Sequence, residues 1–183
     1  MTKKQKTIFI SADHGLAIIY FLQSDVVKTL VEKGARVVVL TDDGLVEQIK
    51  QRFGMPGMIV EGLRYKTCQQ YANAVQPSLQ YWSNYVRRVG TSARINTEAM
   101  DSHIRQVEAE AQGTQRMIAG AGRLVIGLMR HSKPSRQCLV RWQRRFTPAI
   151  YDDLFEKYQP YLVVSATYGW RNDRYLLRES VKR

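Results

Sequence analysis

The sequence predicts an α/β protein built on a parallel sheet of about four strands. Three apolar runs rich in β-branched residues occur at 7–11, 36–41 and 58–60, and segments with helical periodicity separate them. A fourth run, at 161–167, follows a long segment, 67–146, without a strand pattern. Strands that alternate with helices in this order predict right-handed strand–helix–strand units, with helices on both faces of the sheet.

Two helices are predicted between the first three strands. The first follows apolar positions that recur every three or four residues from Leu16 to Leu30, and Gly34 occupies the place of a helix C-cap. The second runs from Leu45 to Phe53 and ends at Gly54.

The segment 67–146 is predicted to be a helical insertion between the third and fourth strands. Helical spacing runs from Tyr71 to Val86, with a break expected at Pro77. Residues 97–111 are rich in good helix formers, whereas 115–129 are interrupted by glycines and predict a poorer helix.

The alternation of helix and strand resumes after the insertion. Thr147 and Pro148 predict the start of a helix that continues to Tyr158 and leads into the fourth strand. A last helix is predicted from Asp173 to the final residue. Because such a helix normally leads to another strand, we expect an exposed edge on the fourth strand. We also expect residues 1–183 to be one Rossmann-like domain, the N-terminal half of a longer two-domain protein; the alternative is a small four-stranded domain with a terminal helix.

The composition is that of a globular and strongly basic chain. Of 183 residues, 44% are hydrophobic and 24% are charged, which argues against wholesale disorder. The net charge of +12 favours an anionic partner such as nucleic acid, an acidic membrane or a phosphorylated substrate. Cys68 and Cys138 lie too far apart for a cysteine zinc motif and are typical of a reducing cytoplasm. The longest apolar run, 16–22, is too short to span a membrane.

The turn after the first strand is the first candidate site. Ligands of open parallel sheets bind beyond the carboxyl ends of the strands, where Asp13, His14 and Gly15 are expected. An imidazole is a suitable general base for a hydroxyl, so His14 is a candidate catalytic base; the alternative is that it only caps the next helix. Neither the dinucleotide pattern GxGxxG nor the phosphate loop GxxxxGK[ST] occurs.

The turn after the fourth strand is expected at the same edge of the sheet. Thr167, Tyr168 and Trp170 combine polar groups with aromatic rings that can stack on a sugar or a base. Asp173 follows them, and a packed turn with Asp173 as a helix N-cap is the alternative. After the second strand, an aspartate at 42–43 is predicted to cap the next helix.

A basic run lies at the end of the insertion. Between residues 116 and 146, eight Lys and Arg occur without Asp or Glu and alternate with apolar and aromatic residues. This composition favours an anionic membrane surface or a lipid-linked substrate; RNA, or a solvated face over a core helix, are the alternatives. The residues predicted to contact the anionic surface are Arg130, Lys133, Arg136, Arg141, Trp142, Arg144 and Arg145.

Three segments together resemble a known family: IFISADHG at 8–15, RVVVLTDDG at 36–44 and PYLVVSAT at 160–167. They resemble the N-terminal, acceptor-side domain of bacterial glycosyltransferases of the two-Rossmann-domain type (GT-B). The resemblance implies that His14 deprotonates an acceptor hydroxyl and that Asp173 orients it. It also implies a basic, apolar patch that meets the membrane and a lipid-linked acceptor.

The resemblance further implies that a nucleotide-sugar donor binds a C-terminal domain or a partner chain, so we expect no cofactor and no transfer activity from these residues alone. The expected reaction is sugar transfer to a hydroxyl in cell-envelope or surface polysaccharide synthesis, in the cytoplasm or at the inner face of the membrane. No metal site is predicted. The alternatives are a non-catalytic basic module that binds RNA or anionic lipid, and a sugar-nucleotide epimerase of the same two-domain fold.

Overall fold

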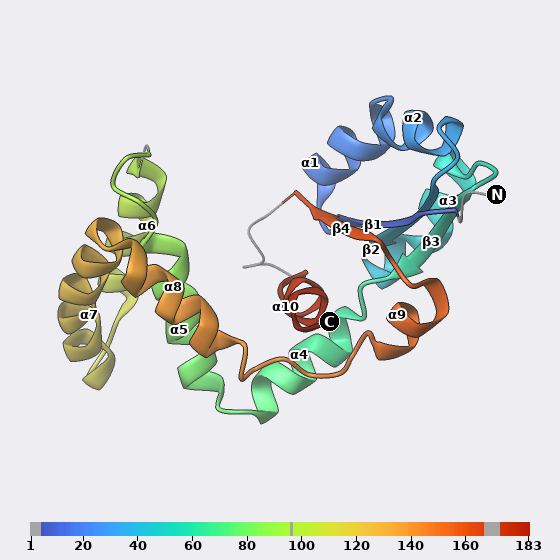
Figure 1. The fold of residues 1–183 in the computed structure, drawn as a ribbon. Coiled ribbons are helices and arrows are strands. Elements are labelled where there is room, and N and C mark those ends of the chain that lie inside the picture. The colour runs from blue at the N-terminus through green and yellow to red at the C-terminus, as the bar shows by residue number, and fades with distance from the viewer. Residues whose placement is uncertain (1–4, 96, 167–172) are drawn as a thin grey trace. The chain divides into compact units, whose positions relative to one another are not determined.

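The computed structural model describes residues 5–95, 97–166 and 173–183 (Figure 1). The chain divides into two compact units. We call residues 1–71 with 147–183 the sheet unit, and residues 72–146 the helical unit.

A four-stranded parallel sheet forms the centre of the sheet unit and confirms the predicted fold class. The strands lie in the order β3-β2-β1-β4. Because the chain leaves β1 for β2 on one side and reaches β4 on the other, the carboxyl end of β1 beside β4 is a topological switch point. The strands are β1 (Thr7–Ala12), β2 (Arg36–Thr41), β3 (Met58–Gly62) and β4 (Leu162–Ser165).

Helices cover both faces of the sheet (Figure 1). On one face lie α1 (Gly15–Ile18), the π-helix η1 (Ile19–Gln23) and α2 (Val26–Glu32). On the other lie α9 (Asp152–Tyr158) and α10 (Arg174–Lys182). The short helix η2 (Asp43–Leu45) and α3 (Val46–Phe53) connect β2 to β3.

Alternate residues of β1 face the two helical layers. Ile10 packs with Ala17, Val27 and Val37 under α1 and α2. Phe9 points to the opposite layer, where its ring centroid lies 5.5 Å from that of Phe155 on α9. Burial on both faces explains why β1 and β2 are almost continuously apolar.

The single helix predicted at 16–30 is wrong, because the chain breaks at Ser24. Ser24 adopts an extended backbone conformation with φ −88° and ψ 171°, and its hydroxyl donates a hydrogen bond to the carbonyl of Tyr20. Serine side chains compete in this way with the backbone bonds of a helix, and here the competition ends η1. Apolar residues recur with helical spacing both before and after Ser24, so the sequence pattern did not reveal the break.

The helix predicted to start after Pro148 begins instead at Asp152. Tertiary hydrogen bonds hold the preceding backbone outside the helix: Arg64 donates to the carbonyl of Ile150, and the Tyr151 N–H donates to both carboxylate oxygens of Glu179 at 3.2 Å. The fourth strand is also shorter than predicted and ends at Ser165. The predicted turn residues 167–170 lie outside the described part of the chain.

Helix α4 (Tyr65–Ala74) leads from the sheet unit into the helical unit. The helical unit consists of α5 (Pro77–Val89), α6 (Glu98–Glu110), α7 (Thr114–His131) and α8 (Lys133–Gln143). Its core is a small cluster of Tyr85, Val89, Ile104 and Ile126. Glycines do not prevent α7 from forming an 18-residue helix, because Ile126 is buried in this core and tertiary packing outweighs helix propensity.

Glu179 provides a test of how α10 is held. Burial and a hydrogen bond with Asp152 raise the pKa of Glu179 to about 7. A carboxyl with a raised pKa favours the folded state most below its unfolded pKa, and this contribution disappears as the pH rises through the folded value. We therefore expect the free energy of unfolding to fall between about pH 4.5 and 7.

The variant Glu179→Gln is expected to remove this part of the pH dependence, because a neutral amide still accepts from Tyr151. Urea unfolding measured across this pH range tests it, with the exposed Glu156→Gln on α9 as the control. An unchanged slope in Glu179→Gln would contradict the assignment.

Candidate functional site

Asp13 and His14 form a hydrogen-bonded pair at the carboxyl end of β1. The Nδ1 atom of His14 lies 2.6 Å from Oδ1 of Asp13. The Asp13 side chain is fully buried, whereas 21% of the His14 side chain is exposed. The carboxylate therefore fixes one ring nitrogen, and the ring keeps access to solvent.

The strands on either side hold this turn in place. Thr41, at the end of β2, donates from Oγ1 to the carbonyl of Ala12 at 3.1 Å. Oγ of Ser11 and Oδ2 of Asp13 are buried and have no hydrogen-bond partner among the described residues. Buried polar atoms are normally hydrogen-bonded, so these two acceptors mark a place for a hydroxyl or a water molecule.

The structure corrects the predicted partner of His14. The carboxylate that contacts the ring is Asp13, which was expected to bind substrate, and not Asp173. Asp173 is fully buried at the start of α10 and accepts a hydrogen bond from Ser165 of β4. Since Ser165 is the register partner of Ser11, Asp173 belongs to the neighbouring strand end at the same switch point.

Of the other predicted substrate ligands, only Gly15 lies in the described part of the chain. A Cβ atom built at Gly15 meets no atom within 4 Å, so the space beside its backbone is open. Thr167, Tyr168 and Trp170 lie outside the described residues.

Two serines belong to the site and were missed by the sequence-based reasoning. Ser11 is the last residue but one of β1 and Ser165 is the last of β4, in the similar triplets Ile-Ser-Ala and Val-Ser-Ala at 10–12 and 164–166. A polar residue at the same register position in two neighbouring parallel strands indicates a site at their carboxyl ends. The repeated triplet is the feature of the sequence that could have identified the two serines.

The buried Cys68 is not a candidate nucleophile, and the described residues form no metal cluster. Cys68 is buried beside the hydroxyl of Tyr151, and burial raises the pKa of its thiol, so it is a poor nucleophile. Across residues 5–95, 97–166 and 173–183, no group of three or more His, Cys, Asp or Glu is placed to hold a metal ion.

The basic run divides into cations with structural roles and cations at the surface. Arg130 bonds Asp101 at 2.7 Å and the carbonyl of Val89 at 3.1 Å. Arg136 donates to the carbonyls of Met129 and Arg130 and thereby caps α7. These two arginines therefore stabilise the helical unit.

The remaining predicted contact residues lie on α8 or just after it. Trp142 is half-buried and packs edge-on against Phe146, with 5.3 Å between the ring centroids, so it contributes to internal packing. The exposed cations are Lys133, Arg141, Arg144 and Arg145.

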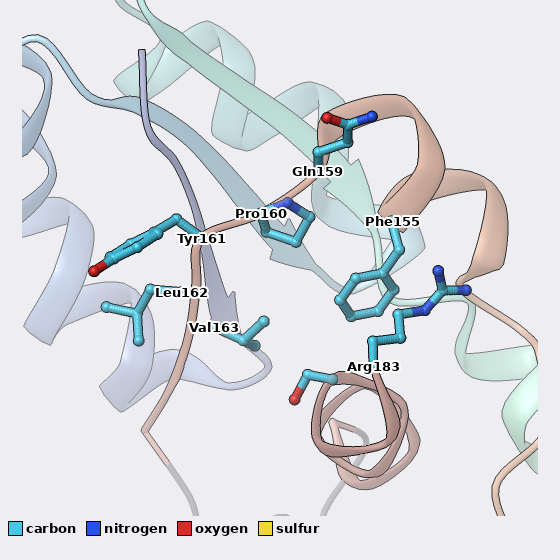
Figure 2. Close-up of a pocket in the computed structure, with 8 residues that line it drawn as sticks. Phe155, Gln159, Pro160, Tyr161, Leu162, Val163 and Arg183 are labelled. Atoms are coloured by element: carbon cyan, nitrogen blue, oxygen red, sulfur yellow. The ribbon is translucent and has the colours of Figure 1, made fainter. Parts of the chain in front are cut away.

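A hollow of about 570 Å³ lies along β4, and residues of three elements line it (Figure 2). Leu162 and Val163 come from β4, Phe155 from α9 and Arg183 from the end of α10. The Arg183 guanidinium lies over the Phe155 ring, 4.8 Å from its centroid. Within the described sheet, β1 is the only strand paired with β4, so the hollow borders an open edge. It adjoins the amino end of β4, whereas ligands of parallel sheets bind at the carboxyl end.

Comparisons with known proteins identify no relative. No protein family, curated protein or solved structure matches the chain.

The Asp13–His14 pair makes a prediction about the histidine tautomer. Because Asp13 accepts a hydrogen bond from Nδ1, the neutral ring is expected to carry its proton there and to leave Nε2 free as the acceptor. Ring ¹⁵N chemical shifts at high pH measure this directly, and the other two histidines, His103 and His131, serve as references in the same spectrum. Asp13→Ala should abolish the preference. If the ¹⁵N shifts of His14 are the same in that variant, the pair does not form.

Proposed function

We propose that this chain is the acceptor-side domain of a glycosyltransferase, in which His14 is the base that activates the acceptor hydroxyl. The observation that carries the proposal is the Asp13–His14 pair at the switch point of a parallel sheet. A base fixed by a buried carboxylate at such a crevice suits proton removal from a hydroxyl. The segments that resemble GT-B enzymes include this turn.

The reaction assigns each group one task. Nε2 of His14 removes the proton of the acceptor hydroxyl while the oxygen of that hydroxyl bonds to the anomeric carbon of the sugar. The bond between that carbon and the diphosphate breaks, and the nucleoside diphosphate leaves with the electron pair. Asp13 stabilises the imidazolium formed in this step. In this proposal the donor binds a second domain or a partner chain, since the sequence contains no glycine-rich phosphate loop.

A specific observation also favours contact with an anionic membrane surface. Five large apolar residues project from one side of α7, with the spacing of a single helical stripe. Leu124 is 81% exposed and Met117 79% exposed. We call this the apolar stripe, which consists of Met117, Ile118, Leu124, Val125 and Leu128. Soluble surfaces rarely expose such a contiguous apolar patch.

The charge of the helical unit complements an anionic bilayer. This unit contains twelve Lys and Arg against four Asp and Glu, and therefore carries most of the net positive charge. An apolar helix face next to exposed cations is the arrangement of helices that lie in the membrane interface. No helix in the described part of the chain has the length and hydropathy needed to cross a bilayer. In the proposal, this surface holds the domain beside a lipid-linked acceptor.

Replacing His14 with alanine tests the catalytic assignment. We expect His14→Ala to lower kcat by roughly 10²–10⁴-fold with little change in the acceptor KM, because the base acts in the transition state. Transfer is measured with a panel of nucleotide sugars and lipid-extract acceptors, on the protein together with the donor-binding domain or partner chain that the proposal requires.

The double variant Asp13→Asn/His14→Ala sharpens this test. If Asp13 acts through His14, the double variant is no slower than His14→Ala alone. The exposed Lys28→Ala on α2 is the control for nonspecific effects. Wild-type kcat in His14→Ala, or no transfer by the wild type across the panel, would contradict the proposed function.

The apolar stripe makes a separate prediction about membrane binding. Leu124→Ser/Leu128→Ser is expected to weaken binding to vesicles of phosphatidylcholine and phosphatidylglycerol about tenfold or more, since two leucines no longer insert. Co-sedimentation with vesicles measures this. Leu79→Ser, at an exposed leucine of α5, makes the same chemical change outside the stripe and should bind normally. Equal losses in both proteins would exclude the stripe as the contact.

A further inference from the structure

A hollow of about 430 Å³ lies between α6 and α7 and is lined by four basic residues. Arg105 comes from α6, whereas Arg123, Arg130 and His131 come from α7. Only Arg130 belongs to the surface predicted from the sequence. Three arginines and a histidine converge here on one concave place of the helical unit.

Ion pairs close both ends of this hollow. At one end Arg130 bonds Asp101 at 2.7 Å, and at the other the Nε atom of Arg123 bonds Glu108 at 2.6 Å. In each helix the paired residues are seven positions apart, about 10 Å along the axis. The middle of the hollow lies between these two pairs.

Arg105 lies between Asp101 and Glu108 along α6, and no described residue neutralises its charge. Within the described residues, Arg105 and His131 have no hydrogen-bond or ion-pair partner. The lining between the ion pairs is apolar and comes from Ile104 and Ile126. A Cβ atom added to Gly127 meets nothing within 4 Å, so this part of α7 leaves open space.

We propose that this hollow binds a phosphate monoester group, with Arg105 and His131 as its ligands and Arg123 and Arg130 as flanking guanidinium groups. Arginine is suited to phosphate because its planar fork donates two parallel hydrogen bonds. The hollow has room for one headgroup, and no phenyl, phenol or indole ring lines it in the described structure. Single-stranded nucleic acid usually needs a longer charged track and stacking rings.

Two sources can present this chemistry: a free phosphorylated metabolite or the headgroup of an anionic lipid. The apolar stripe is on the same helix, since Leu124 and Leu128 alternate in sequence with Arg123 and Gly127. The lipid source therefore rests on the membrane contact proposed above. Neither source depends on the chemistry of His14.

NMR tests the site by following the amide chemical shifts of α6 and α7 during a titration with glycerol 3-phosphate. We expect saturable shifts in the wild type and an affinity about tenfold lower in Arg105→Gln, which loses a charged hydrogen-bond donor. Arg52→Gln makes the same charge change at an exposed residue of α3, outside the hollow, and should bind as the wild type does.

A second variant separates the hollow from general electrostatics. Gly127→Leu fills the open space without changing the charge, and leucine favours a helix more than glycine does. We expect it to abolish the titration. Equal losses in Arg105→Gln and Arg52→Gln, normal binding by Gly127→Leu, or no saturable shift in the wild type would each overturn the proposal.

Vesicles distinguish a lipid headgroup from a free metabolite, and a phosphate monoester from a phosphodiester. A lipid source predicts tighter binding to phosphatidic acid than to phosphatidylserine at equal surface charge, and Gly127→Leu should remove this preference. Glycerol 3-phosphate binding without a lipid preference identifies a soluble metabolite. Displacement of glycerol 3-phosphate by an oligoribonucleotide without terminal phosphates would overturn the assignment of the hollow to a phosphate monoester and would indicate nucleic acid instead.

Discussion

Strand β1 is paired with β2 along one edge and with β4 along the other, and helices cover both of its faces. This double burial requires apolar side chains along the strand and brings polar residues to its carboxyl end. Asp13 and His14 follow that end directly. The Asp13–His14 pair is thus positioned by a strand that is paired on both edges and covered on both faces, where small movements of the backbone are costly.

The polar atoms at the switch point come from neighbouring strands in register. Ser11 pairs with Ser165, and Ser165 in turn bonds Asp173 at the start of α10. The hydrogen bond from Thr41 fixes the carbonyl just before Asp13. Three parallel strands therefore contribute to one small polar region, while the opposite edge of β4 borders a separate hollow.

Positive charge in the helical unit has more than one physical role. Arg136 caps α7, and Arg130 ties α7 to Asp101 and the end of α5. Arg141 on α8 is exposed and free to attract a distant anionic surface. Arg105 is also exposed, but it lines a hollow beside apolar side chains. Net charge accounts for the long-range attraction of any anion, whereas selection of one kind of anion requires a hollow that fits it.

The amino-acid sequence by itself determined the strand–helix order, because apolar strands buried on both faces and amphipathic helices have different periods. It also placed Asp13 and His14 at a strand end. Tertiary structure decided which carboxylate contacts His14, where α9 begins and which arginines remain at the surface. Each of these depends on hydrogen bonds between residues distant in sequence or on the rotation of one side chain. Local patterns carry no information on such contacts until the helices and strands have packed.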